Sequence, residues 1–177
     1  ARGPFGNKSP ASSPQVRPVP FDPKKALTLL QEVGWKLGEK GLIREIDGKP
    51  VNFEFTMLLS NPEREKYLTV IKEEMAKIGI TMHIKILEWN SFMKVFDDRK
   101  FDAMVLGWGV NSLEEDPTQI WHSKSIPSPG SNFVGYSNPA VDKLIDALRV
   151  EPTEKKRREL LHRVHEQIAA DQPYTFL

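Results

Sequence analysis

The feature that most constrains the fold of this chain is a strand–helix–strand pattern over residues 51–87. Apolar residues fill every second position from Phe53 to Leu59, which predicts a strand with one buried face. A second alternating strand spans 80–87, and Asn61 can start the helix between the two strands. The large apolar residues of that helix share one face: Tyr67, Ile71, Met75 and Ile78. Strands joined in this way pair in parallel, so the sheet should be partly parallel.

Further strands are predicted on both sides of this unit. Asp47-Gly48 favours a tight turn, so residues 43–46 and 51–59 should form a hairpin. A short helix over 89–96 comes before an apolar strand over 101–108, which repeats the strand–helix–strand pattern.

Three more helices are expected after residues that favour helix N-termini. Asp22, Asn138 and Thr153 can each accept a hydrogen bond from a first helical turn, and periodic apolar residues follow each of them. Gly34 should end the first of these helices. The sequence therefore predicts an α/β fold, with helices packed on a mixed, mostly parallel sheet.

Length and composition favour one α/β domain over residues 21–173. With 177 residues, of which 39% are hydrophobic, the chain can bury one substantial core but hardly two. Residues 1–20 include five prolines and show no periodicity, which predicts an extended connection. Residues 174–177 resemble the start of a strand, so we expect the natural chain to continue beyond them.

Several functional classes lack support in the sequence. The 25 basic and 24 acidic residues nearly balance without a basic stripe, so no nucleic-acid partner is expected. The longest apolar run, 103–110, is far shorter than the roughly 20 residues that span a bilayer. The chain has no cysteine, which excludes thiolate metal sites and cysteine nucleophiles. No cofactor, metal site or catalytic residue is expected.

The strongest candidate site follows the last apolar strand. That strand leads into Trp108 and Gly109, and the polar residues Asn111, Glu114 and Asp116 come next. Open α/β sheets bind small ligands at the carboxyl ends of their strands, so these residues are predicted to contact a ligand. Three later residues complete the candidate ligand-binding set: Trp121, Asn132 and Tyr136. We expect Trp108, Asn111 and Trp121 to lie on an exposed surface.

Most of these residues also have a purely structural interpretation. Trp108 could be a core aromatic residue at the end of a strand. The acidic residues 114–116 could form a solvated turn that caps a short helix over 117–121, since acidic side chains favour helix N-termini. Tyr136 and Asn132 could serve only to form the turn before the next helix.

The histidines do not form a recognisable metal motif. His162 and His165 share one helix face, but Arg158 lies on the same side and the spacing is not that of a zinc-binding His-Glu-x-x-His helix. A wet amphipathic surface is the favoured interpretation of this face. His122 follows Trp121 near the candidate site, and a role beside a haem or nickel ligand stays open there as the less favoured alternative.

Four short motifs occur in a characteristic order along the chain: Phe21 to Leu30 with Gly34-Trp35, Phe101 to Gly109, Asn132 to Leu144, and Asp171 to Tyr174. This order resembles the bacterial extracellular solute-binding proteins of the peptide/nickel family (family 5), which serve ABC importers. The resemblance implies one lobe of a periplasmic binding protein-like (type II) fold. The chain is similar to the second, C-terminal lobe only.

The resemblance implies a receptor for a peptide or similar small solute, and not an enzyme. Such a receptor captures its ligand between two lobes that close like a hinge, and it delivers the ligand to permease subunits in the membrane. We expect a monomer in the periplasm or outside the cell, either free or anchored to the cell envelope by a lipid. Fold analogy leaves open a sensory or chaperone-like peptide-binding domain that is not coupled to transport.

One position departs from the family pattern. In peptide-binding members, the loop after the Gly-Trp pair carries an aspartate that pairs with the α-ammonium group of the peptide, and Asn111 stands at that position here. A neutral amide would lose the charge-assisted hydrogen bond. The departure argues against ordinary peptides with a free amine, unless Glu114, Glu115 or Asp116 replaces the aspartate.

Overall fold

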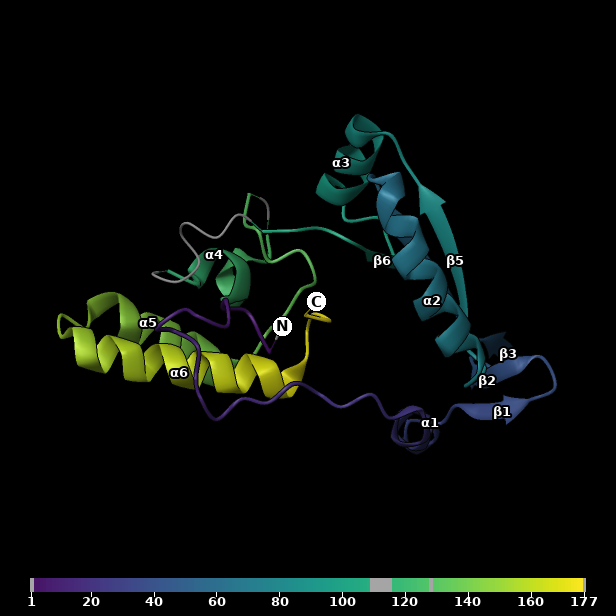
Figure 1. Cartoon of the computed structure of the whole chain (residues 1–177), viewed down its shortest axis with the longest axis horizontal. Helices are drawn as coiled ribbons and strands as arrows, with labels where there is room; N and C mark the ends of the chain where they lie inside the picture. The colour runs from purple at the N-terminus through teal and green to yellow at the C-terminus, as the bar shows by residue number, and fades with distance from the viewer. Residues whose placement is uncertain (1, 109–115, 128, 177) are drawn as a thin grey trace. The chain divides into compact units, whose positions relative to one another are not determined.

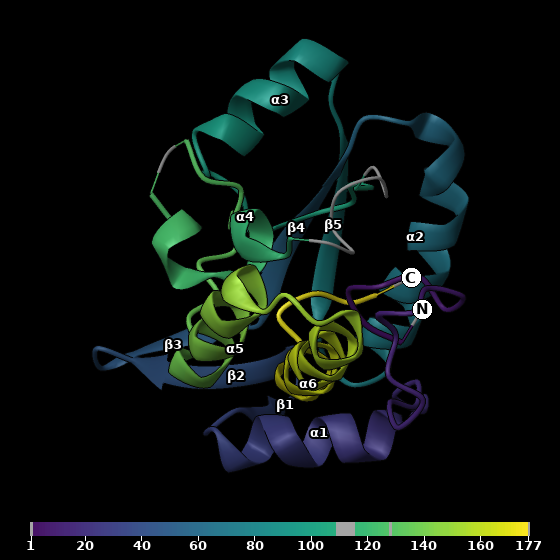
Figure 2. The ribbon, with the colours of Figure 1, turned by 90° about the vertical axis from the view of Figure 1, so that its left-hand side faces the viewer.

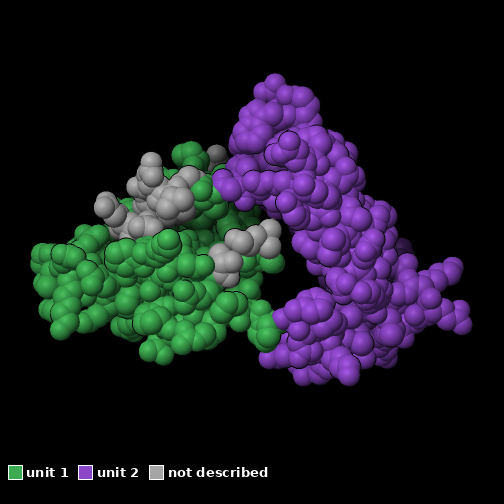
Figure 3. Space-filling model, in the orientation of Figure 1, with its two compact units in different colours: residues 1–20, 108–177 green, residues 21–107 purple. Residues whose placement is uncertain are grey.

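The computed structural model describes residues 2–108, 116–127 and 129–176. The chain forms two compact units: unit 1 contains residues 1–20 and 108–177, and unit 2 contains residues 21–107 (Figure 3). The chain therefore passes from one unit to the other twice, at 20–21 and at 107–108. The second passage lies within the range 21–173 that the sequence predicts as one domain.

Unit 2 contains the predicted parallel sheet. β4 (Glu54–Leu59) is the central strand, and β5 (Thr81–Ile86) and β6 (Ala103–Met104) pair with it in parallel on its two sides (Figures 1 and 2). This arrangement confirms the α/β class and the partly parallel sheet. The apolar strand expected over 101–108 is wrong in length, because only two of its residues pair with β4.

The connections between these strands are the predicted helices. η1 (Pro62–Arg64) and α2 (Glu65–Ala76) link β4 to β5, and α3 (Trp89–Asp97) links β5 to β6. The side chain of Asn61 accepts a hydrogen bond from the Glu63 N–H (2.9 Å) and so starts the first connection as expected. Both strand–helix–strand units are therefore present.

The core of unit 2 lies between α2 and the parallel sheet. Leu59, Leu68 and Met82 are buried there, with Ile71 and Met75 packed against them. The predicted helix face is partly wrong, because Leu68 faces this core whereas Tyr67 is 63% exposed. Leu68, Ile71 and Met75 follow the spacing of one helix face, and Tyr67 lies beside that face.

A second, antiparallel sheet in unit 2 corrects the predicted hairpin. β1 (Lys36–Gly38), β2 (Gly41–Ile46) and β3 (Lys49–Asn52) pair in this order, with the expected turn at Asp47-Gly48. The second arm does not extend over 51–59, because Phe53 separates β3 from β4. Its N–H donates to the Leu42 carbonyl (2.8 Å), while its own carbonyl accepts from the Thr81 N–H (2.9 Å). Phe53 thus passes the chain from one sheet to the other.

The helix predicted after Asp22 begins unit 2. α1 (Pro23–Glu32) is capped by the Asp22 side chain, which accepts from the Lys25 N–H (2.9 Å). Gly34 follows the helix with φ of 94°, a conformation that favours glycine, so it ends α1 as expected. No residue of α1 is buried.

Unit 1 is built on two long helices that lie side by side, α5 (Pro139–Val150) and α6 (Glu154–Asp171) (Figures 1 and 2). α4 (Thr118–Trp121) contacts α5, and η2 (Ser123–Ser125) follows it. Asn138 caps α5 by accepting from the Ala140 N–H (2.9 Å). Thr153 occupies the corresponding position before α6, but its side chain makes no capping hydrogen bond.

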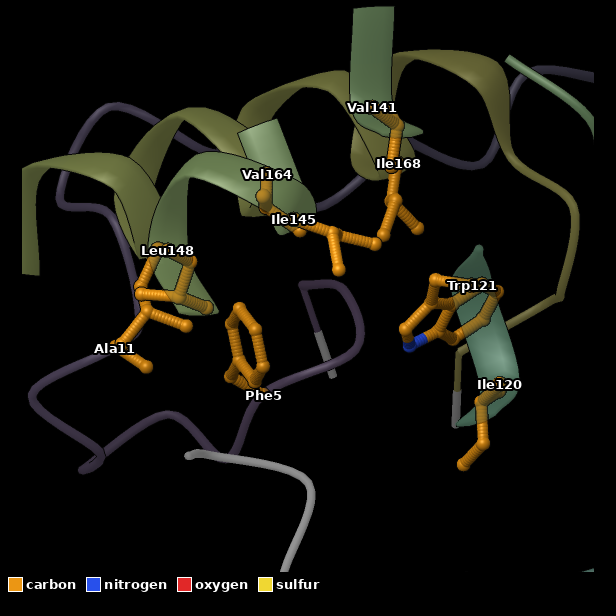
Figure 4. Close-up of a cluster of buried hydrophobic side chains, with 10 residues drawn as sticks. Phe5, Ala11, Ile120, Trp121, Val141, Ile145, Leu148, Val164 and Ile168 are labelled. Atoms are coloured by element: carbon orange, nitrogen blue, oxygen red, sulfur yellow. The ribbon is translucent and has the colours of Figure 1, made fainter. Parts of the chain in front are cut away.

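The core of unit 1 joins these helices to the N-terminal segment (Figure 4). Its buried side chains are Phe5, Ala11, Ile120, Trp121, Val141, Ile145, Leu148, Leu161, Val164 and Ile168. Residues 2–20 form no helix or strand, yet Phe5 and Ala11 belong to this core. Within the described ranges, no helix is both long and apolar enough to cross a membrane.

Candidate functional site

The candidate residues that the structure describes all belong to unit 1: Trp108, Asp116, Trp121, Asn132 and Tyr136. The other three, Gly109, Asn111 and Glu114, lie outside the described residues. Trp108 and Asp116 precede α4, Trp121 belongs to α4, and Asn132 and Tyr136 lie in the loop before α5. Three of them, Trp108, Trp121 and Tyr136, are aromatic.

This aromatic cluster is centred on Trp121, at the end of α4. The Trp121 ring lies 4.7 Å from the ring of Tyr174 and 6.1 Å from that of Phe176, between centroids. Tyr136 presents its ring edge-on to Trp121, at 6.1 Å and 83°. Trp108 stacks on Phe133 at 6.0 Å and packs against the core of unit 1. Aromatic rings at these distances and angles stabilise each other beyond the area they bury.

Trp121 is 2% exposed, so the expectation that it lies on an exposed surface is wrong. The cause is the C-terminal segment, whose Tyr174 and Phe176 pack against the indole ring. Among the described residues, the indole nitrogen of Trp121 has no hydrogen-bond partner. Trp108 and Tyr136 are only partly buried and are therefore the aromatic candidates that a ligand could reach directly.

Asn132 is fully buried and its amide group is used within its own loop. Its Nδ2 donates to the carbonyls of His122 (3.2 Å) and Tyr136 (2.7 Å), and its Oδ1 accepts from the Tyr136 N–H (2.9 Å). Because the amide is fully buried, a ligand contact would require opening this loop, and an unpaired buried polar group is costly. The geometry thus favours the turn-forming role of Asn132.

The phenol of Tyr136 is fixed by Asp171, at the end of α6. Tyr136 Oη donates to Asp171 Oδ2 (2.5 Å), and Asn138 Nδ2 donates to the same oxygen (2.7 Å). Burial raises the pKa of Tyr136, and the Asp171 carboxylate raises it further, so the phenol stays protonated and donates. Burial also acts to raise the pKa of Asp171, but hydrogen bonds from Tyr136, Asn138 and Gln167 outweigh it and leave that pKa below its usual value.

Asp116 holds the start of α4. Its Oδ1 accepts from the Thr118 N–H (3.0 Å) and from the Thr118 hydroxyl. Burial acts to raise the pKa of Asp116, but these bonds and the nearby charges of Arg149 and Lys124 lower it overall. A surface pocket of about 400 Å³ opens here, lined by Asp116, Lys124 and Arg149 among others. Because two cations already share this pocket, Asp116 is poorly placed to attract an ammonium group.

His122 is buried, beside two carboxylates of α5. Its Nδ1 accepts from the Lys124 N–H (3.1 Å), and its Nε2 lies 3.4 Å from Asp146 Oδ1. The Asp142 carboxylate, 3.3 Å from Nδ1, accepts from the Ser123 N–H (2.9 Å). Across the part of the chain that the structure describes, no group of three or more acidic or histidine side chains could hold a metal ion.

His165 contradicts the wet surface expected for its helix face. It is fully buried, and its Nδ1 accepts from the Ser13 N–H (2.8 Å). The N-terminal segment covers this part of α6, and the helical pattern alone cannot show such a distant neighbour. His162 is partly exposed and contacts the Pro10 carbonyl through Nε2 (2.9 Å).

Sequence comparison identifies one matching family. Residues 1–128 match the model of the bacterial extracellular solute-binding proteins, family 5 Middle. The chain is 35% identical over 159 residues to the oligopeptide-binding protein AppA of Bacillus subtilis (strain 168), covering 89% of this chain and 29% of that protein. It is 27% identical over 146 residues to a dipeptide-binding protein of Escherichia coli (strain K12), covering 82% and 26%. The chain thus spans less than a third of the length of these relatives.

Structural comparison agrees. The structure of Bacillus subtilis AppA in complex with a nonapeptide matches 99% of this chain and 36% of that chain, with a TM-score of 0.81 and 35% identity. The oligopeptide-binding protein of Thermus thermophilus complexed with a pentapeptide matches 98% and 32%, with a TM-score of 0.86 and 27% identity. These likenesses confirm the periplasmic binding protein type II fold.

Proposed function

The chain belongs to the bacterial extracellular solute-binding proteins of family 5, and we propose that it forms part of the substrate-binding component of an ABC importer. The family match over residues 1–128 carries this proposal. Proteins of this family bind solutes and are not enzymes. The receptor captures its ligand between two lobes, and permease subunits in the membrane accept the ligand when the lobes open.

A peptide is the ligand class that the relatives support best. The two similar structures described above hold a nonapeptide and a pentapeptide. In this chain, Trp108 supplies a partly buried indole ring beside the aromatic cluster, and a peptide can lie against such a ring with its side chains or its backbone. Asn111 provides no charge for a peptide amine, and Asp116 is already bonded to Thr118 and surrounded by cations. Unless Glu114 or Glu115 replaces the family aspartate, the ligand should therefore be held mainly by its backbone.

The receptor works as a monomer in the periplasm or at the outer face of the cell envelope. A sensory or chaperone-like peptide-binding role on the same fold is the second candidate, because peptide capture alone does not require a permease. Deleting the genes of the importer's permease subunits separates the two. Uptake of the bound peptide stops if the protein serves import, and any signalling or chaperone effect persists if it does not.

The ligand surface is tested by replacing Trp108 with alanine in the full-length protein. Losing a buried apolar contact of about 1.5–3 kcal/mol should weaken peptide binding roughly 10- to 150-fold in calorimetric titration. Trp35→Ala is the matched control, because Trp35 packs on Phe53 in unit 2 and its loss should leave affinity unchanged. Equal affinity of wild type and Trp108→Ala would remove Trp108 from the site while leaving the transport role intact.

A further inference from the structure

Three side chains of α6 bind the N-terminal segment through hydrogen bonds. His162 Nε2 meets the Pro10 carbonyl (2.9 Å), His165 Nδ1 accepts from the Ser13 N–H (2.8 Å), and Glu166 Oε1 accepts from the Ser13 hydroxyl (2.5 Å). We call these three residues of α6 the clasp. Ser13 and His165 stand 152 positions apart in the sequence, so the clasp closes a long loop of chain.

His165 is the fully buried residue of the clasp. It is 0% exposed, and the edge of the Phe5 ring packs against its imidazole at 5.7 Å and 68°. The backbone of Gly3 lies directly over Nε2, since a Cβ atom at this position would stand only 2.4 Å from that nitrogen. Water therefore has little access to either ring nitrogen.

We propose that His165 makes a pH-sensitive contact with the N-terminal segment. Protonation of His165 releases residues 2–16 from α6. The Nδ1 atom can accept the Ser13 N–H only while it carries no proton. Adding a proton there places two N–H groups against each other and puts a positive charge into an apolar core. Both effects oppose the bound position of the segment, so proton binding and release of the segment are coupled.

The charged neighbours of His165 favour the neutral ring. Burial lowers its pKa, and the positive charges of His162 and Arg2 lower it further. The Glu166 carboxylate and the Arg2 backbone act in the opposite direction but do not outweigh them. The Glu166 carboxylate is also engaged by Ser13. A released His165 regains the ordinary pKa of about 6.5, so release favours protonation.

The pH range follows from this direction. Because the pKa of His165 is lower in the clasped state than in the released state, the clasp is fully stable above about pH 6.5 and weakens as pH falls towards the lowered value. Residues 2–16 come just before the first passage of the chain into unit 2, at 20–21. Release of residues 2–16 would leave a longer unbound stretch of chain before that passage. Acidic pH would thereby loosen the covalent connection between the units.

Hydrogen–deuterium exchange of the full-length protein tests the proposal. Exchange of peptides within residues 2–16, divided by the intrinsic rate at each pH, should rise by up to tenfold per pH unit below about pH 6.5. Peptides from α2, in unit 2, are the internal control and should keep a constant protection. A segment whose protection is the same at pH 7.5 and pH 5 would overturn the proposal.

Two variants separate His165 from its neighbour. His165→Asn keeps an acceptor near Nδ1 but cannot titrate, so protection of residues 2–16 should lose its pH dependence. His162→Gln is the matched control on the same helix face and should keep that dependence. Equal pH dependence in wild type and His165→Asn would refute the role of His165.

Nuclear magnetic resonance of the wild type covers the case in which His165→Asn fails to fold. The His165 imidazole signals should titrate below pH 6.5, over the same range in which the Ser13 amide loses protection. Titration at or above pH 6.5 with the amide still protected would contradict the coupling.

Discussion

At the scale of single residues, Asp171 organises more of unit 1 than its exposed position suggests. Its carboxylate accepts hydrogen bonds from Tyr136, Asn138 and Gln167, and so joins the end of α6 to the loop that carries a candidate ligand residue. The sequence alone marks Asp171 only as the first residue of a family motif. Its partners lie more than thirty positions away except for Gln167, so no local pattern indicates them.

Replacing Asp171 with alanine should lower the free energy of unfolding of unit 1 by about 1–2 kcal/mol at pH 7, since bonds to an exposed carboxylate are partly screened by solvent. The pKa of Asp171 is lower in the folded state, so its contribution is present above about pH 4 and is lost as pH falls through the lowered value. Urea unfolding at pH 7 and at pH 2.5 checks this. A difference from wild type that is as large at pH 2.5 would show that the carboxylate charge is not responsible.

The burial of a histidine cannot always be predicted from its position in a helix or strand. Alternation alone places His83 on the polar face of its strand, and it is exposed. His165 shares a helix face with Arg158 and His162, yet it is buried because residues 2–16 cover it. Periodicity reports the environment that a helix or strand creates for itself, and it carries no information about a segment without regular structure that packs on it later.

At the scale of elements, caps and periodicity predict the helices closely. Asp22, Asn61 and Asn138 each accept the hydrogen bond that their position requires. The strands are less predictable, because alternation continues through Phe53 while the strand changes its partner. β1 is not predicted at all, since its three residues contain only one large apolar side chain.

The contact between two glycines in unit 2 gives a prediction at this scale. The Leu42 N–H donates to the Gly79 carbonyl at 2.7 Å, and a Cβ atom on Gly41 would lie 2.7 Å from the same oxygen. Gly41 also has φ of 110°. Gly41→Ala should therefore destabilise unit 2 by about 2–4 kcal/mol in urea unfolding.

Gly48→Ala is the control for this substitution. Gly48 also has a positive φ, of 73°, but a Cβ atom there would meet nothing within 4 Å. Its cost should be only about 1 kcal/mol, from the backbone conformation alone. Similar losses of unfolding free energy in the two variants would mean that the close approach of Gly41 to the Gly79 carbonyl does not add to the destabilisation.

At the scale of the whole molecule, the described residues form two separate hydrophobic core clusters, one in each unit. Composition cannot show this division, because the total apolar content is compatible with one larger core. The family resemblance gives the fold class correctly, but the division of the chain at 107–108 has no signal in the local sequence. The sequence predicts the candidate site as a set of residues, but it does not predict that Tyr174 and Phe176 cover part of it.

Two core substitutions test whether the units are energetically separate. Leu148 and Met82 are each buried in a different core, and Leu148→Ala and Met82→Ala should each cost about 2–5 kcal/mol. Hydrogen exchange should accelerate in α5 and α6 for the first variant, and in α2, β4 and β5 for the second. Acceleration in both units from either substitution would show that they unfold together.

Calorimetric titration of the full-length protein with short peptides tests whether this chain is part of a peptide-binding importer receptor. Matched peptides would carry either a free or an acetylated N-terminus. Because Asn111 provides no charge for an amine, we expect acetylated peptides to bind at least as well as free ones. Binding of free-amine peptides alone would show that a neighbouring carboxylate replaces the family aspartate. Heat from neither set would contradict peptide capture itself.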